Sequence, residues 1–114
     1  MSEPLRAAGR ALDVQIETSV FGSTIQDHPF GPRRWREEHG FTGWDDVPRY
    51  STEIGAAWTI VEHFWAVAID QCAGVIPPYT VTITSRNLAQ TWQAKADTAA
   101  LAICRVALLA VEEG

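Results

Sequence analysis

The segment TAALAICRVALLAVEE, residues 98–113, constrains the fold more than any other part of the chain. On a helical projection its apolar residues fall on one side, at Leu101, Cys104, Leu108 and Val111, and on other sides, at Ile103, Val106, Ala107 and Ala110. A helix that is apolar almost all round must be buried on several faces. With Asp97 or Thr98 as its N-cap, this helix is the expected centre of the core.

Arg105 is the one charge in the interior of this segment. A long arginine side chain can cover apolar surface with its stem and keep its charged end in water. We therefore expect Arg105 to be a surface arginine, with a buried pairing or a ligand role as the alternative.

Two further stretches show helical periodicity. Over residues 4–21 the apolar residues recur at steps of three and four, Pro4 suits the first turn, and Gly22 is placed for a left-handed C-terminal cap. A second helix is expected to begin near Thr52, with Ser51 as its N-cap, and to continue to about residue 71. Its end is ambiguous, because FWAVAID, residues 64–70, also fits a buried strand.

A change to period two follows the two prolines at residues 77 and 78. YTVTITS, residues 79–85, alternates apolar and polar side chains and predicts a half-buried strand. AQTWQAKA, residues 89–96, predicts a returning strand after a turn at 85–88. Two strands alone are marginal, so a third is expected from the long loop, from residues 64–69 or from a second subunit.

Length and composition fit one folded domain. A chain of 114 residues has the size of a single core, and 46% apolar with 20% charged residues is typical of globular proteins. The net charge of −5 argues against a nucleic-acid polymer as partner. No apolar run reaches the ~20 residues that span a bilayer, and no signal peptide opens the chain, so we expect no membrane association.

Cys72 and Cys104 are the two cysteines, and their spacing matches no metal or redox motif. Because both lie in alanine-rich, apolar surroundings, we expect both to be reduced core residues. A disulfide between them remains the alternative.

Residues 22–50 lose the helical periodicity, because glycines and prolines recur throughout them. We predict a long loop, within which RRWREEHG could form a short helix. A structureless stretch longer than ~15 residues is uncommon in a compact domain and is usually functional or disordered. The many aromatic side chains of this segment argue for packing rather than disorder.

The same segment carries the residues best suited to hold a ligand. Its arginines could bind a small phosphorylated ligand, and its tryptophans could stack on a base. The candidate ligand-binding residues are Arg33, Arg34, Trp35, Arg36, Trp44, Arg49 and Tyr50. The alternative is a solvated surface of compensated charge, because the neighbouring acids are Glu37, Glu38, Asp45 and Asp46.

The sequence offers no recognisable catalytic or cofactor-binding arrangement. His28, His39 and His63 lack HxH or HExxH spacing, and no nucleophile elbow or phosphate-cradling glycine loop is present. Glu62 and His63 would point to different sides of a helix, which makes a metal site there a poor hypothesis. We predict a protein that is not an enzyme and holds neither cofactor nor metal.

Three stretches together resemble the phage ABA-sandwich domain family. They are GRALDVQIETSVFG, residues 9–22, VPRYSTEIGAAWTIVEHF, residues 47–64, and ADTAALAICRVALLAV, residues 96–111. They resemble, in the same order, the three helix signatures of that family. The resemblance implies a phage or prophage origin, an α-β-α layered sandwich of the α+β class, and no established enzymatic activity. It places the variable part of the chain in the Arg- and Trp-rich loop at about 22–50.

Two functions from different classes follow. In the first, a phage accessory protein in the cytoplasm of the infected bacterial host acts as a sponge that sequesters a nucleotide-like immune signal. In the second, the aromatic loop binds a host or phage protein. Either way, five tryptophans and an almost wholly apolar helix exceed what one hairpin can cover, so we expect a homo-oligomer. If the loop is a ligand site, Trp35→Ala and Arg34→Ala should leave the melting temperature nearly unchanged.

Overall fold

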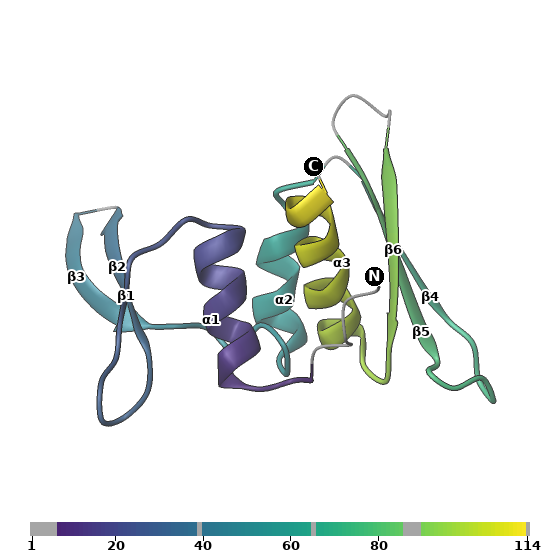
Figure 1. Ribbon diagram of the computed structural model, residues 1–114, viewed down its shortest axis with the longest axis horizontal. Coiled ribbons are helices and arrows are strands. Elements are labelled where there is room, and N and C mark those ends of the chain that lie inside the picture. Colours follow the sequence, from purple (N-terminus) through teal and green to yellow (C-terminus); the bar gives the residue numbers. More distant parts are fainter. Residues whose placement is uncertain (1–6, 39, 65, 86–89, 114) are drawn as a thin grey trace.

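The computed structural model describes residues 7–38, 40–64, 66–85 and 90–113 (Figure 1). The described helices are α1 (Arg10–Ser19), α2 (Ile54–Val61) and α3 (Ala99–Glu113). The predicted first helix is confirmed but begins later, because residues 7–9 are not helical and 4–6 lie outside the described part. Gly22 adopts the expected left-handed conformation, with φ +71°, and Ser23 N donates to Glu17 O. This closes the end of α1.

Helix α3 lies at the centre of the core, as predicted. Its residues 100–104 and 106–108 are all buried, and the Thr98 hydroxyl accepts a hydrogen bond of 3.2 Å from the backbone N–H of Leu101. Strands contact it on one side and the other two helices on another. This position explains why a helix without a polar face is stable here.

The sheet beside α3 has the order β4-β5-β6, with β4 (Ala66–Gln71), β5 (Tyr79–Thr84) and β6 (Thr91–Ala96) all antiparallel. The predicted hairpin is therefore confirmed, although its residues 86–89 lie outside the described part. Val81 and Ile83 are buried, and the threonines that alternate with them are not. The inner face of this sheet packs against α3.

The prediction that the second helix continues to about residue 71 is wrong. Helix α2 ends at Val61, tightens into short turns where His63 and Phe64 donate to carbonyls three residues back, and gives way to β4. In β4, Val67 pairs with Ile83 and Ile69 with Val81. Cross-strand contact between β-branched residues therefore prevails over the local helical pattern. This strand is the third one that the hairpin requires.

The prediction of a long loop at residues 22–50 is also wrong. The segment contains a second antiparallel sheet, β1-β2-β3, built from β1 (Ile25–Gln26), β2 (Arg33–Glu38) and β3 (Phe41–Asp46). RRWREE is a strand and not a helix. The pair Glu38↔Phe41 closes the β2–β3 hairpin, and Gly40, at φ +82°, lies in its turn. A positive φ at this place favours glycine.

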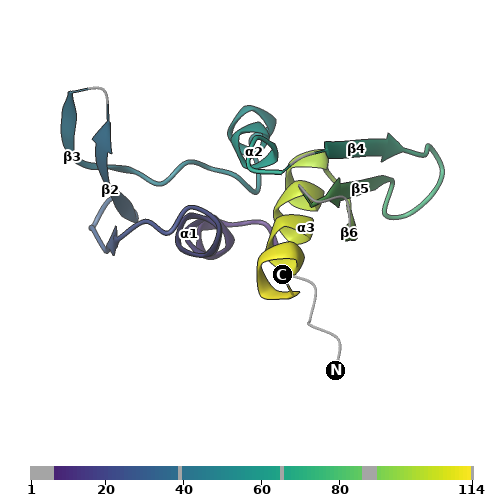
Figure 2. The same cartoon turned by 90° about the horizontal axis from the view of Figure 1, so that it is seen from above.

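The helices lie between the two sheets (Figures 1 and 2). Figure 1 shows the β1–β3 sheet beyond α1 at one end of the long axis and the β4–β6 sheet beyond α3 at the other. The α+β class is confirmed. The α-β-α order of layers is not confirmed, since the described elements follow the order sheet, helices, sheet.

The two cysteines differ in burial. Cys104 is buried as predicted, and burial raises the pKa of its thiol to about 12. The prediction of a core position for Cys72 is wrong, because it lies just past the end of β4 and is exposed. Both are free thiols. Within the described residues, no helix is long and apolar enough to span a bilayer.

Candidate functional site

Strand alternation divides the predicted ligand-binding residues between two faces of the β2–β3 hairpin. Successive side chains of a strand point to opposite faces, so Arg33 and Trp35 share one face and Arg34 and Arg36 share the other. On β3, Trp44 pairs with Trp35, and Asp45 pairs with Arg34. The sequence cluster is therefore not one site. We call the face of Trp35 and Trp44 the outer face, and the face of Arg34 the inner face.

On the inner face, Arg34 contacts a buried acid of α1. Its Nη1 lies 2.9 Å from Glu17 Oε1, and Glu17 is only 1% exposed. The Tyr50 hydroxyl donates to the same oxygen at 2.6 Å, and the Ser23 hydroxyl donates to Glu17 Oε2 at 2.5 Å. Three donors from three segments thus satisfy one buried carboxylate.

Tyr50 takes part in this contact as a neutral donor. Burial raises the pKa of its hydroxyl well above the ordinary value, and the nearby Glu17 carboxylate raises it further. The ring is 1% exposed and stacks on Phe21, with ring centroids 5.5 Å apart. Tyr50 therefore anchors the chain between β3 and α2 to α1, and its face is not open to a ligand.

A second buried acid of α1 extends this contact. Asp13 Oδ1 accepts from the backbone N–H of Ser51 at 2.8 Å and from the Ser51 hydroxyl at 2.7 Å. Arg10 bridges Asp13 Oδ2, at 2.9 Å, and Val47 O, at 2.7 Å. We call the set Asp13, Glu17, Arg34, Tyr50 and Ser51 the polar seam. Ser51 is a member of the seam and not the N-cap of α2, which is Glu53.

Sequence reasoning missed the seam, because Glu17 falls off the apolar stripe of the first helix. The usable signal is the spacing of Asp13 and Glu17, four residues apart and therefore on one helical face. Ile16, which is fully buried, adjoins that face.

Arg36 is also engaged by an acid. Its Nη1 lies 2.9 Å from Asp45 Oδ2. This hydrogen bond lowers the pKa of Asp45, partial burial opposes the shift, and the backbone N–H of Asp46 and the charge of Arg34 support it. The inner-face arginines are thus compensated by acids of the same chain.

The outer face presents two tryptophans in contact with each other. The rings of Trp35 and Trp44 meet edge to face, with centroids 5.3 Å apart at 73°. Trp35 remains 38% exposed, and its indole N–H donates to Glu37 at 2.9 Å. Because the rings contact each other directly, they form one aromatic platform and not two walls of a cleft.

The other two candidate cations are Arg33 and Arg49. Arg33 lies on the outer face, with its Nε 3.7 Å from Asp46 Oδ1, and Asp46 is 78% exposed. Arg49 is exposed, and its carbonyl accepts from the backbone N–H groups of Thr52 and Glu53 ahead of α2. Among the described residues, the Arg49 guanidinium forms no ion pair. Of the seven candidates, the structure thus brings Arg33, Trp35 and Trp44 together on an accessible surface.

The histidines form no chemical site in the described chain. His63 meets Phe21 edge to face, with ring centroids 4.6 Å apart, and the ring centroid of His28 lies 5.6 Å from that of Phe30. His39 lies outside the described residues. Within the described residues there is no group of three or more His, Cys, Asp or Glu side chains placed to hold a metal ion.

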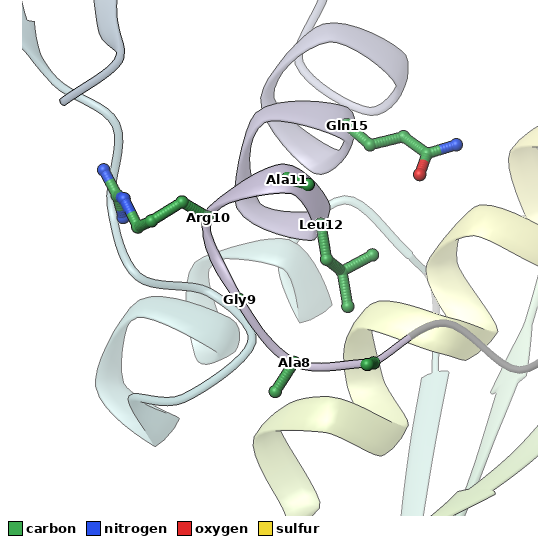
Figure 3. Close-up of a pocket in the computed structure, with 7 residues that line it drawn as sticks. Ala8, Gly9, Arg10, Ala11, Leu12 and Gln15 are labelled. Carbon is green, nitrogen blue, oxygen red and sulfur yellow. The ribbon is translucent and has the colours of Figure 1, made fainter.

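A shallow, open depression of about 450 Å³ lies at the start of α1 (Figure 3). Its lining residues are Ala7, Ala8, Gly9, Arg10, Ala11, Leu12 and Gln15. Figure 3 shows Leu12 directed towards α3 and Arg10 directed away to the opposite side, where it bonds Val47. The depression therefore offers mainly alanine methyl groups and few polar groups that could orient a small ligand.

Comparison with known proteins places the chain in a phage family. A crystal structure of a phage protein from Bacillus cereus ATCC 14579 superposes with a TM-score of 0.76. At 24% identity it covers 98% of this chain and 94% of its own, which establishes a shared fold. A search of curated proteins finds no match. The family model described as Phage ABA sandwich domain matches residues 18–108, and the chain belongs to that family of phage proteins.

Proposed function

We propose that this phage protein acts by binding and not by catalysis, and that it binds through the outer face of the β2–β3 hairpin. The observation that carries the proposal is the Trp35–Trp44 platform. It stays partly exposed, while the opposite face of the same hairpin is fixed to α1 through Arg34 and Glu17. A rigid hairpin that presents exposed indole rings is suited to recognition.

The partner that fits this surface best is a host or phage protein with an apolar and basic surface. The outer face offers exposed aromatic area, and tryptophan and arginine are the usual energetic anchors of protein interfaces. Its charged side chains are Arg33, Glu37 and Asp46, one cation against two acids. With a net charge of −5 over the whole chain, complementary potential favours a basic partner.

The second candidate is a sponge for a small, phosphorylated, nucleotide-like host signal. It is supported by Arg33, which lies on the same face as the tryptophans and whose own ion pair is long, at 3.7 Å. A base could stack on Trp35 while Arg33 binds a phosphate. Against it, Arg34 and Arg36 are engaged on the other face. The two outer-face acids also repel a phosphate. We therefore rank it second.

The test uses two exposed tryptophans as a matched pair. Trp35 is 38% exposed on the hairpin, and Trp58 is 47% exposed on α2. Proteins captured from the host by the unmodified chain are purified, and their affinities for the wild type, Trp35→Ala and Trp58→Ala are measured by calorimetry. We expect Trp35→Ala to weaken binding at least tenfold, while Trp58→Ala retains it. Equal losses in the two variants would refute this surface.

The sponge is tested in parallel on the pure protein. Mononucleotides and cyclic dinucleotides are screened by thermal denaturation, which is sensitive because ligand at a hundred times its Kd adds about 2.7 kcal/mol of apparent stability. A shift that is lost in both Arg33→Ala and Trp35→Ala would move the sponge to first place. If no compound of the panel shifts the melt, the sponge hypothesis is rejected.

A further inference from the structure

The outer edge of β4 carries hydrogen-bonding groups that are free among the described residues. Cys72 N donates to Pro78 O across the β4–β5 ladder, which fixes the residues of β4 that bond to β5. Since hydrogen-bonded positions alternate in an antiparallel pair, the N–H and C=O groups of Val67, Ile69 and Gln71 point away from β5. No described residue bonds to them there. They form a row of three donors and three acceptors along the strand Ala66–Gln71.

The opposite edge of the same sheet is protected. Ser85 N donates to Gln90 O, so the carbonyl of Lys95 points away from β5, out of the free edge of β6. Arg105 Nη1 donates to that carbonyl at 2.9 Å. Arg105 is therefore partly buried and reaches from α3 to the edge of the sheet. A strand that arrives at β6 would have to displace it, and would meet the charge of Lys95 as well.

The side chains of β4 do not deter pairing. The strand AVAIDQ contains neither proline nor lysine, and its ladder with β5 runs without a bulge. Ile69 pairs with Val81 and lies on the same face of this sheet, the face that packs against α3, yet it is 37% exposed. An edge strand that is regular, apolar and uncharged apart from Asp70 is the kind that recruits another strand.

We propose that β4 of a second copy of this chain pairs antiparallel with β4, so that two three-stranded sheets join into one six-stranded sheet about a twofold axis. Of the antiparallel registers that match the pattern of free groups and keep the α3-facing sides of the two sheets continuous, those centred on Ala68 and on Ile69 pair the most residues of β4. Centred on Ala68, Val67 lies opposite Ile69 of the second copy; centred on Ile69, the two Ile69 side chains meet. Asp70 lies opposite an alanine in both. The edge is thus complementary to itself, without like charges in opposition.

This surface is separate from the hairpin of the proposed function, because the two sheets lie at opposite ends of the molecule (Figure 1). It also gives the expected homo-oligomer a definite interface. The two proposals can therefore fail independently.

The first experiment compares proline variants at the two edges by light scattering over a concentration series. At Ile69 and at Gln93 on β6 the backbone N–H points out of the sheet, so proline leaves the internal ladder intact. We expect the wild type and Gln93→Pro to form dimers, and Ile69→Pro to remain a monomer. A monomeric wild type at high micromolar concentration would overturn the proposal, as would equal association of the two variants.

A second measurement needs no substitution and so holds even if a proline variant unfolds. Amide hydrogen exchange by NMR is followed in the wild type at low and high protein concentration. We expect the amides of Val67, Ile69 and Gln71 to become protected as concentration rises, while those of Thr91 and Gln93 on the other edge stay fast. Protection that does not depend on concentration would reject β4 as the interface.

Discussion

The two sheets of this protein are joined to the helices by different chemistry. The β4–β6 sheet packs on α3 through apolar side chains such as Val81, Ile83 and Leu108, each no more than 1% exposed. The β1–β3 sheet is joined to α1 through the polar seam, in which Glu17 accepts from Arg34 and Tyr50. The stabilisation from the apolar contact is nondirectional and proportional to the buried area. The stabilisation from the polar seam depends on particular hydrogen-bonding partners.

This difference predicts how each attachment fails. An apolar contact loses free energy in proportion to the atoms removed and the cavity left behind. In the seam, removal of Arg34 leaves the buried Glu17 carboxylate without its counter-charge, and that penalty exceeds the net value of the pair itself. Conservative replacements should therefore restore stability to different extents in the two regions.

The largest effect is expected in the apolar attachment. Leu108 is fully buried on α3, so Leu108→Ala should lower the free energy of unfolding by roughly 2–5 kcal/mol, the usual range for a buried leucine. Urea denaturation of the two proteins measures the difference, and Leu108→Met should recover most of it. A loss under about 1 kcal/mol would mean that α3 is not the centre of the core.

Arg34→Ala is the matching test of the polar seam. Breaking a buried ion pair costs roughly 3–5 kcal/mol, and the 18% exposure of the Arg34 side chain places our expectation at the low end, about 3 kcal/mol. This replaces the sequence-based expectation of an almost unchanged melting temperature. Arg33→Ala, one residue away on the outer face, is the control and should be nearly neutral. Equal effects of the two substitutions would contradict the division of the hairpin into two faces.

The parts of the fold that were predictable from sequence are those in which one side of an element meets apolar surface. The periodicity of residues 99–113 and the alternation around Val81 both reflect burial against the core, so α3 and the β5–β6 hairpin follow from the pattern. Strand β2 reads RRWREE, and its inner face is charged. Its burial partner is the acid Glu17 and not the hydrophobic core, so a search for apolar alternation overlooks it.

The candidate site was predictable only as a set of residue types. The sequence predicts that arginine and tryptophan gather near residues 33–50, but β pairing decides which side chains share a face. One residue of offset places Arg34 against Glu17 and Arg33 beside the tryptophans. Cys72 shows the same limit, because its apolar neighbours Val75 and Ile76 are themselves exposed. Local composition does not reveal which apolar segment finds a surface to cover it.

Trp35→Ala measures how much the outer face of the hairpin contributes to stability. Because Trp35 is partly exposed, most of the stability lost in this variant comes from the edge-to-face contact with Trp44. Such aromatic pairs contribute ~0.5–1.5 kcal/mol beyond burial. We expect the free energy of unfolding to fall by about 1–2 kcal/mol, which replaces the nearly unchanged melting temperature expected from the sequence but stays well below the ~3–5 kcal/mol of a core tryptophan. Trp35→Phe should restore part of it. A loss of stability as large as that of Leu108→Ala would mean that the two tryptophans form a second core.

The smallest effect concerns Asp45, at the solvent end of the inner face. The hydrogen bond from Arg36 holds the pKa of Asp45 below its ordinary value, so the folded state binds this proton less readily than the unfolded chain. The stability that Asp45 contributes is therefore present above the unfolded pKa of about 4 and is lost as pH falls through the lower, folded value. Asp45→Asn removes this dependence. The difference in unfolding free energy between wild type and variant should thus be larger at neutral pH than in acid, as measured by urea denaturation at both. A difference that does not change with pH would mean that Asp45 and Arg36 are not coupled in solution, and that the tie between β2 and β3 depends on backbone pairing alone.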